Sequence, residues 1–310
     1  MISLQKTTFY LFITFIINVS CTRTEKDSIS FKQKIKEMNI VPSEYYTINS
    51  SRDTLLEGGQ GTKITIPKLT FCDENGNILP EIKIELREFY KLSDMMFSNL
   101  TTMSNGKIIE TGGMIYINAT SENKKLEIVK GKNITVEFKT NYNSEMKVFS
   151  GETDSLGNIN WYKQNEKRLN EDAPRVDTIP YSPNLHNILT SNTLGWVNCD
   201  KFLSFPETTD IFVKNQNGID TNVFCGLILK KYNSIIPSTF TNNNAVKFHP
   251  VPLNEEAIII LLSFKQDKYS YGFKDVVLSK KATYDISMNF ISKEELIKKL
   301  SQFDKLRPLF

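Results

Sequence analysis

The chain of 310 residues has few of the side chains on which most metal and hydrolase sites depend. It holds two histidines, His186 and His249, and neither has a partner at the spacing of an HExxH zinc motif. A GxSxG nucleophile turn is also absent from the sequence. The sequence therefore predicts no metal, no cofactor and no catalytic residue.

The sequence also lacks an excess of charge of one sign. The formal net charge is +3, from 38 basic and 35 acidic residues that are interspersed along the chain. Because a nucleic-acid surface needs clustered basic residues, we expect no nucleic-acid partner. After the N-terminus, the longest apolar run is Ala257 to Phe264, which is too short to span a bilayer and suits a buried strand.

Four cysteines leave little room for a disulfide framework. Cys21 belongs to the N-terminal segment described next, so Cys72, Cys199 and Cys225 remain. An odd remainder permits at most one internal bridge, and Cys199–Cys225 is the pairing that we consider. The alternative is that both are small buried apolar side chains, which is a common fate of cysteine and is preferred here.

The N-terminus has the pattern of a secretory signal peptide. Lys6 precedes an apolar run over residues 9–19, which is too short to span a bilayer. The segment Asn18 to Cys21 resembles a bacterial lipobox, although Asn18 replaces the usual apolar residue. This resemblance implies that Cys21 carries acyl chains such as palmitate, and each buried CH₂ adds about 0.8 kcal/mol to membrane attachment. A cleaved signal with a chance cysteine is the alternative.

The composition and pattern changes predict five segments. We expect a signal peptide over residues 1–20, a lipidated tether over 21–57, an N-terminal β-sandwich domain over 58–163, a linker over 164–190, and a C-terminal β-sandwich domain with a terminal helix over 191–310. The fold class that follows is mainly β, with two tandem β-sandwich-like domains and a short C-terminal helix.

Period-two alternation supports the sandwiches, and helical spacing supports the helices. Ile82, Ile84 and Leu86 alternate with charged residues, as in a half-buried strand. Short helices are expected at residues 31–38 and 91–99. The strands expected in the second domain are Asp210 to Lys214, Val223 to Lys230, Val246 to Pro250, Ala257 to Phe264, Tyr271 to Leu278 and Thr283 to Phe290.

The C-terminal helix has a clear start and a one-sided apolar face. Ser292 and Glu295 have the spacing of a capping box. Leu296, Leu300 and Phe303 then form an apolar stripe, which we expect to pack on the second sandwich. A helix that binds a partner is the alternative.

Two segments carry a resemblance to a known group of proteins. One is the ETGGM segment at residues 110–114, and the other is GWVNCDKF at residues 195–202. Together they resemble a set of Bacteroidetes lipoproteins and surface proteins of unassigned activity that pair an ETGGM-bearing β-domain with such a second segment. The β-domain is in turn similar to the scaffold domain of ankyrins and netrin receptors. The resemblance implies interaction without catalysis, by analogy of fold alone.

The residues of these motifs also have a physical interpretation. Gly112 and Gly113 predict a bulge or a close strand approach. Trp196 is expected to fill a core between the domains, with Asn198 and Asp200 capping a turn. The functional alternative is that Trp196, or Trp161, stacks on a sugar.

Four Asp-(Ser/Thr)-apolar steps are similar to the O-glycan acceptor pattern of exported Bacteroidetes proteins. The acceptors would be Ser28, Thr54, Ser155 and Thr178, all in segments expected to be linkers or turns. Ordinary turn-forming Asp-Ser and Asp-Thr steps are the alternative.

The sequence therefore predicts a lipid-anchored protein of the cell envelope, at the outer membrane and facing the periplasm or the surface. We expect it to bind or assemble with an envelope or surface protein, without catalytic activity. A carbohydrate-binding surface lipoprotein, or an envelope hydrolase of glycan or peptide, is the alternative.

Replacement of Cys21 tests the anchor. Cys21→Ala removes the only thiol that a lipobox could acylate, so the protein should lose its acyl chains and leave the membrane fraction. Fractionation of cells and intact mass of the exported protein measure this. Continued acylation and membrane retention of the variant would contradict the anchor.

Overall fold

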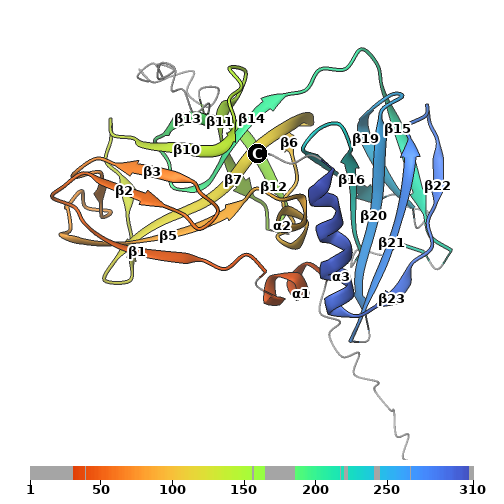
Figure 1. Cartoon of the computed structure of the whole chain (residues 1–310), viewed down its shortest axis with the longest axis horizontal. Coiled ribbons are helices and arrows are strands. Elements are labelled where there is room, and N and C mark those ends of the chain that lie inside the picture. Colours follow the sequence, from red (N-terminus) through yellow and green to blue (C-terminus); the bar gives the residue numbers. More distant parts are fainter. Residues whose placement is uncertain are drawn as a thin grey trace, which may run out of the picture.

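The computed structural model describes residues 31–38, 40–155, 157–164, 186–216, 218–219, 223–240, 245–265 and 267–306. Within these ranges the protein is mainly β, with several sheets and a short C-terminal helix, as the sequence predicts. Figure 1 shows two groups of strands side by side, with helices between them.

The first sandwich contains, in the described ranges, an eight-stranded and a four-stranded sheet. The larger sheet has the order β1 (Glu44–Asn49), β5 (Glu81–Phe89), β7 (Lys107–Ser121), β14 (Gly195–Phe202), β11 (Lys147–Thr153) and β12 (Ile159–Lys163), with β6 (Met103–Ser104) and β8 (Lys124–Lys125) paired to β7. The smaller sheet has the order β13 (His186–Ser191), β10 (Ile134–Asn141), β3 (Lys63–Ile66) and β2 (Thr54–Glu57). A separate pair joins β4 (Phe71–Cys72) and β9 (Glu127–Ile128).

The second sandwich contains, among the residues that can be described, a four-stranded and a five-stranded sheet. The first has the order β18 (Thr239–Phe240), β19 (Ala245–Pro252), β15 (Thr208–Lys214) and β22 (Thr283–Asp285). The second has the order β17 (Ser234–Pro237), β16 (Val223–Leu229), β20 (Glu256–Lys265), β21 (Lys268–Val277) and β23 (Asn289–Ile291).

The apolar pattern of each strand follows from the faces that it buries. In β5, Ile82, Ile84 and Leu86 point into the core of the first sandwich, while the residues between them are half-buried or exposed. Strand β20 is different, because its residues 257–264 are all buried. Ile259 packs in the core of the second sandwich, and Ile260 packs on the opposite face. A strand covered on both faces needs a continuous apolar run.

A third core joins the two sandwiches. It combines Phe89, Met114 and Trp161 of the larger sheet of the first sandwich with side chains of β16, β20 and β21, including Ile260 and Tyr271. Three helices and a 3-10 turn also contribute to it: α1 (Phe31–Met38), α2 (Leu92–Phe97), α3 (Lys293–Leu300) and η1 (Ser301–Lys305). We call this apolar cluster the shared core. An interface of this kind restricts motion between the two sandwiches.

The helices occur where the sequence predicts them. The capping box of α3 is confirmed, because the Ser292 hydroxyl accepts the Glu295 N–H and the Glu295 carboxylate accepts the Ser292 N–H. Leu296 and Leu300 of α3 are fully buried in the shared core. The helix therefore packs on the outer face of the second sandwich, between it and the first (Figure 1).

The expected tether over residues 21–57 differs from the structure. Ile35 of α1 is buried in the shared core, and the Val41 carbonyl accepts a hydrogen bond from Arg87 Nε at 3.0 Å. Residues 44–49 and 54–57 are strands that pair with β5 and β3. These strands are short and half-exposed, so their alternation gives a weak signal. Residues 21–30 lie outside the described residues, as do residues 1–20, the expected signal peptide.

The expected linker over 164–190 and the domain start at residue 191 also differ. Residues 186–191 form β13, which pairs with β10, and β14 lies in the middle of the larger sheet of the first sandwich. Long-range pairing of this kind leaves no local mark in the sequence. The first sandwich therefore includes residues 186–202, and the strands of the second begin at β15. Residues 165–185 lie outside the described residues.

The single strand expected over residues 283–290 is two strands in different sheets. β22 pairs with β15, and β23 pairs with β21. Ile286 lies between them, buried in the core of the second sandwich. The chain therefore crosses from one sheet to the other at this edge, which continuous β propensity could not reveal.

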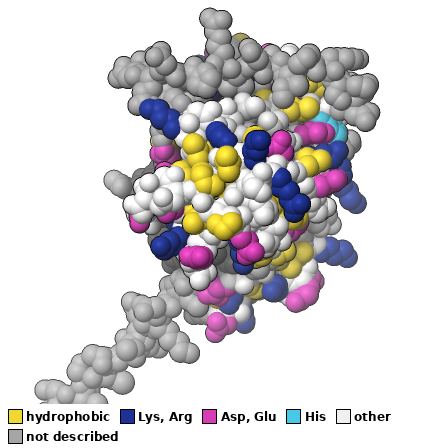
Figure 2. All heavy atoms as spheres, turned by 90° about the vertical axis from the view of Figure 1, so that its left-hand side faces the viewer, with side chains coloured by type: hydrophobic (Ala, Val, Ile, Leu, Met, Phe, Trp, Pro, Cys, Tyr) yellow, Lys and Arg dark blue, Asp and Glu magenta, His cyan; other side chains and the backbone are white. Residues whose placement is uncertain are grey.

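The outer end of the first sandwich shows mixed surface chemistry. On the face in Figure 2, apolar side chains lie in small groups between basic and acidic side chains. Basic and acidic side chains are therefore interspersed on this face, as they are along the sequence.

Candidate functional site

The two motif segments pair directly with each other. ETGGM lies in β7 and GWVNCD lies in β14, and these strands are antiparallel neighbours. The register pairs Trp196 with Tyr116, Asn198 with Met114, and Asp200 with Thr111. The register shifts between Asn198 and Asp200, so two residues of β7, Gly112 and Gly113, oppose Cys199 alone. The predicted bulge at the two glycines is confirmed.

Gly113 is required at this bulge by a neighbouring ring. Its φ is +133°, and a Cβ atom there would overlap the Tyr90 ring. The Tyr90 hydroxyl lies 2.7 Å from the Thr62 hydroxyl and accepts the Lys139 N–H at 3.1 Å. The bulge therefore lets a buried tyrosine connect the larger sheet to β3 and β10.

The polar residues of GWVNCD are buried in the strand, and the expectation that they cap a turn is wrong. The Thr111 hydroxyl donates to the Asn198 amide oxygen at 2.7 Å, and the Asn198 amide nitrogen donates to Asp200 Oδ2 at 2.6 Å. Asn198 and Asp200 are both fully buried. The bulge forms this row because it places Thr111 and Asp200 opposite each other.

This polar row also reaches the second sandwich. The Thr111 N–H donates to the Asn233 carbonyl at 3.0 Å, and the Asn233 side chain donates to the Thr111 carbonyl at 3.0 Å. Nearby, the Thr102 and Ser234 hydroxyls lie 2.8 Å apart. The motif residues thus hold the two sandwiches together by directional bonds beside the shared core.

Asp200 is the carboxyl group of this row, and its pKa is strongly shifted. Burial raises its pKa well above the usual range, and the negative charge of nearby Glu110 adds to the shift. Its Oδ1 atom is buried without a hydrogen-bond partner among the described residues. Burial therefore favours the neutral, protonated form of the side chain, because this form avoids an uncompensated buried charge.

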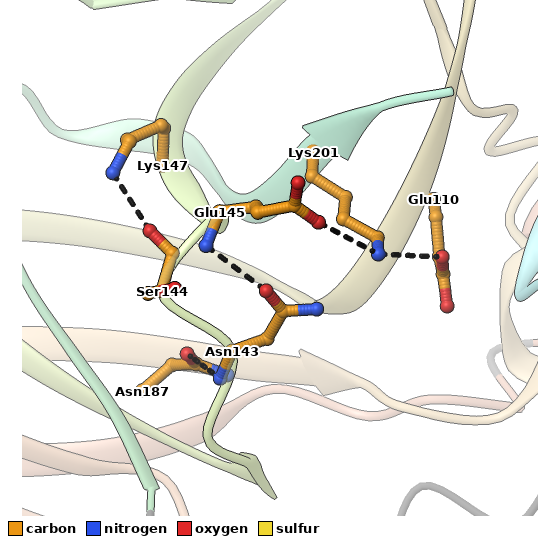
Figure 3. A network of polar contacts seen from close by, with 7 residues as sticks. All are labelled: Glu110, Asn143, Ser144, Glu145, Lys147, Asn187 and Lys201. Carbon is orange, nitrogen blue, oxygen red and sulfur yellow. Dashed lines mark hydrogen bonds and ion pairs between the residues drawn. The ribbon is translucent and has the colours of Figure 1, made fainter. Parts of the chain in front are cut away.

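A second polar group lies at the rim of the same strands. Lys201 Nζ lies 3.6 Å from the Glu110 carboxylate and 3.2 Å from the Glu145 carboxylate (Figure 3). The Asn143 side chain accepts the Glu145 N–H at 2.9 Å, and the Asn187 side chain accepts the Asn143 N–H at 3.0 Å. These contacts tie the loop before β11 to β14 and β13, so the group is structural.

The backbone N–H groups of the glycine-rich loop before β3 bind carboxylates of the protein itself. The Glu88 carboxylate accepts the Gln60 N–H at 2.7 Å and the Thr62 N–H at 2.8 Å. The Gly59 N–H donates to the Glu44 carboxylate at 3.1 Å. Backbone donors that could hold an anion thus hold two carboxylates of this chain.

The two tryptophans do not form a sugar platform. Trp161 is fully buried, and its Nε1 donates to the Thr101 carbonyl at 2.7 Å. Trp196 is partly buried against the shared core, as the sequence predicts. Its ring centroid lies 5.3 Å from that of Phe89 and 5.2 Å from that of Tyr116. Trp161 is therefore excluded as an exposed ligand platform, and Trp196 packs edge-on to Tyr116 and tilted against Phe89.

The considered Cys199–Cys225 bridge does not form. Both residues are buried free thiols, Cys199 in the core of the first sandwich and Cys225 in the core of the second. Burial raises the pKa of each thiol. The preferred alternative, small buried apolar side chains, describes both residues. Cys72 is also a free thiol and is half-buried.

The two histidines lie apart and each contacts a carboxylate. His186 Nδ1 lies 2.7 Å from Glu137, and His249 Nδ1 lies 2.5 Å from Asp210. A hydrolase would need one of them near a hydroxyl or thiol nucleophile. No such contact occurs for either histidine within the described part of the chain, and the search for His, Cys, Asp and Glu clusters there finds no metal site.

The expected glycan acceptors fall in different settings. Ser155 is exposed in a turn, as expected, whereas Thr54 begins β2 and pairs with Ile66. Ser28 and Thr178 lie outside the described residues, as does Cys21.

An open pocket of about 290 Å³ lies at the edge of the five-stranded sheet. It is lined by Tyr271, Gly272, Phe273, Ser287, Asn289, Phe290, Ile291, Glu295 and Lys299. The Phe290 ring is 70% exposed and the Phe273 ring 47%. Aromatic rings beside a few polar groups are the usual lining of a ligand site, so this pocket is the candidate binding site.

Sequence reasoning missed this pocket. Its residues come from β21, β23 and α3, with Ser287 from the segment before β23, and a single strand was expected across that segment and the start of β23. One feature of the sequence does point to the pocket: Phe273 and Phe290 are large aromatic residues in segments otherwise rich in charged and polar side chains. A search for apolar residues on predicted solvent faces would have singled them out.

Comparisons with known proteins give no family. No family model and no curated protein matches the chain. Across the described ranges, the helices are all too short or too polar to cross a bilayer.

The buried carboxyl group predicts a pH dependence of stability. Above pH 4 the unfolded chain loses the Asp200 proton that the native chain keeps, so stability falls by about 1.4 kcal/mol per pH unit as pH rises toward the native pKa. Asp200→Asn should remove this fall and raise the free energy of unfolding at pH 7 by about 1–3 kcal/mol. Urea unfolding between pH 4 and pH 8 measures it.

Asp94 provides the matched control. Burial raises its pKa to about 6, so Asp94→Asn should remove only the fall between pH 4 and pH 6. Equal pH slopes for the wild type and Asp200→Asn above pH 6 would show that Asp200 is ionised in the native chain.

Proposed function

We propose that this protein is a lipid-anchored binding or assembly protein of the cell envelope, without catalytic activity, which presents its β-sandwiches to a protein partner. The anchor is Cys21, and the sequence pattern around it supports a position at the outer membrane. The resemblance of the two motifs to Bacteroidetes lipoproteins supports the same function.

The observation that carries this proposal is the exposed apolar surface around the pocket. Phe273 and Val277, which are 47% and 56% exposed, lie on the same face of β21. Phe290 of β23 is 70% exposed, but it pairs with Ser270 and so lies on the opposite face of the sheet. Exposed apolar side chains that gather in one place mark a contact surface, whereas scattered ones need no explanation. The motif residues, by contrast, are engaged in holding the two sandwiches together.

One further ligand class is supported by the same pocket. Aromatic rings together with Ser287, Asn289 and Lys299 resemble the mixture of stacking and hydrogen bonding that holds a sugar. Carbohydrate is therefore the second candidate, now at this pocket and not at Trp161.

Site-specific cross-linking in native envelopes tests the proposal. A photoreactive phenylalanine analogue at position 273 of the lipidated protein should give a discrete cross-linked protein, identified by mass spectrometry. The same analogue at Leu55, which is 65% exposed on the first sandwich, is the matched control and should not. Absence of any protein adduct from position 273, together with binding of the protein to a glycan array, would favour carbohydrate and contradict a protein partner.

A further inference from the structure

Strand β21 is covered along one edge and open along part of the other. All ten residues of Lys268–Val277 pair with β20, whereas β23 pairs only with Tyr269–Tyr271. Beyond Tyr271, no strand of the described chain lies along the outer edge of β21. An uncovered edge presents backbone groups that another strand can bind.

The hydrogen bonds at the end of β21 show which backbone groups face outward. The Leu278 N–H donates to the Glu255 carbonyl, and its carbonyl accepts the Asn254 N–H, so both groups point toward β20. In an antiparallel sheet, alternate residues direct their groups to opposite neighbours. Phe273 and Asp275 therefore direct their N–H and C=O groups to the open edge.

Two further observations agree with this assignment. The Val277 carbonyl, which is outward by the same alternation, accepts the Tyr284 hydroxyl at 2.8 Å. At Gly272, a Cβ atom would lie 2.5 Å from the Ser287 carbonyl oxygen, because the chain crosses between the sheets at that point. The open edge thus begins where the crossing leaves β21, directly beside the pocket.

The open stretch carries two charged side chains, and both contact other parts of the protein. Natural proteins protect edges with charge, proline or bulges. Asp275 lies 2.6 Å from Lys230 Nζ, and Lys274 Nζ donates to the Asp285 carbonyl at 3.3 Å. Phe273 and Val277 are exposed on either side of this charged pair of residues. Two exposed apolar side chains are therefore available to a strand at this edge.

The charges around the edge favour an acidic occupant. Lys274, Lys281 and Lys299 are exposed here, along with Lys280. Several carboxylates of the same region are engaged: Asp275 and Glu256 contact Lys230, and Glu295 caps α3. Asp285 on neighbouring β22 and Glu294 of α3 are further exposed carboxylates of this region. Positive charge therefore predominates beside the open edge.

A second copy of the chain fits less well. Two-fold antiparallel pairing centred on the middle of this edge, at Lys274 or Asp275, would place that residue opposite its own copy, because paired residues must share a face. Either arrangement opposes like charges, which disfavours the pairing.

We propose that an extended segment of a partner protein, with alternating apolar and acidic residues, adds as a strand to the outer edge of β21. Its backbone bonds to Phe273 and Asp275, and one apolar side chain enters the pocket between β21, β23 and α3. This inference rests on the proposed function and names how that partner is bound. Backbone bonds would supply affinity and the pocket would supply selectivity.

The test uses two variants at one position. Asp275→Pro removes the outward N–H while leaving the β20 ladder intact, because Asp275 does not bond to β20 and proline is tolerated at sheet edges. Asp275→Ala loses the same contact with Lys230 but keeps the N–H, so it is the matched control. Circular dichroism and urea unfolding verify that both variants are folded.

A random twelve-residue peptide library displayed on phage is selected on the full mature chain. We expect enriched peptides to alternate apolar and acidic residues and to slow hydrogen exchange at the Phe273 and Asp275 amides. Asp275→Ala should keep this binding, and Asp275→Pro should bind about tenfold more weakly.

Three outcomes would overturn the proposal. The first is equal binding of the selected peptides to both variants. The second is that selection on the wild type enriches no peptides beyond those enriched by selection on Asp275→Pro. The third is a dimer of the wild type in sedimentation that Asp275→Pro abolishes, which would assign the edge to a second copy. A cross-link from position 273 that persists in Asp275→Pro would leave the proposed function standing and remove only this mode of binding.

Discussion

The shared core between the two sandwiches is the constraint on which the rest of the structure depends. Strand β20 is buried on both faces because one face belongs to the second sandwich and the other to the shared core. Helices α1 and α3 close this core, and the polar row at Thr111 and Asn198 adds directional bonds beside it. A rigid unit of this kind holds the open edge of β21 in a fixed relation to helix α1 and to the first sandwich.

The motif residues have a structural task, and the candidate binding site lies elsewhere. Gly113 and Asp200 fit a bulge that joins two central strands, and their side-chain environment is closed to solvent. The pocket and the open edge, by contrast, use Phe273 and Phe290, which belong to neither motif. A distinctive sequence motif can therefore reflect a demanding packing problem, while recognition depends on residues with no motif at all.

Local patterns predicted the elements, and non-local pairing decided the architecture. The alternation of β5, the capping box of α3 and the bulge at Gly112–Gly113 depend on near neighbours, and all three were predicted from the sequence. The placement of β14 in the first sandwich and the division of residues 283–290 between two sheets depend on partners far away in the chain. The candidate pocket could not be predicted for the same reason, because three separate elements form it.

Calorimetric unfolding of the mature chain tests the central claim most directly. If the shared core makes the sandwiches one cooperative unit, the protein should unfold in a single transition whose calorimetric and van't Hoff enthalpies agree. Two transitions, each with the enthalpy of a domain of half this size, would show that the sandwiches are independent and would contradict the account.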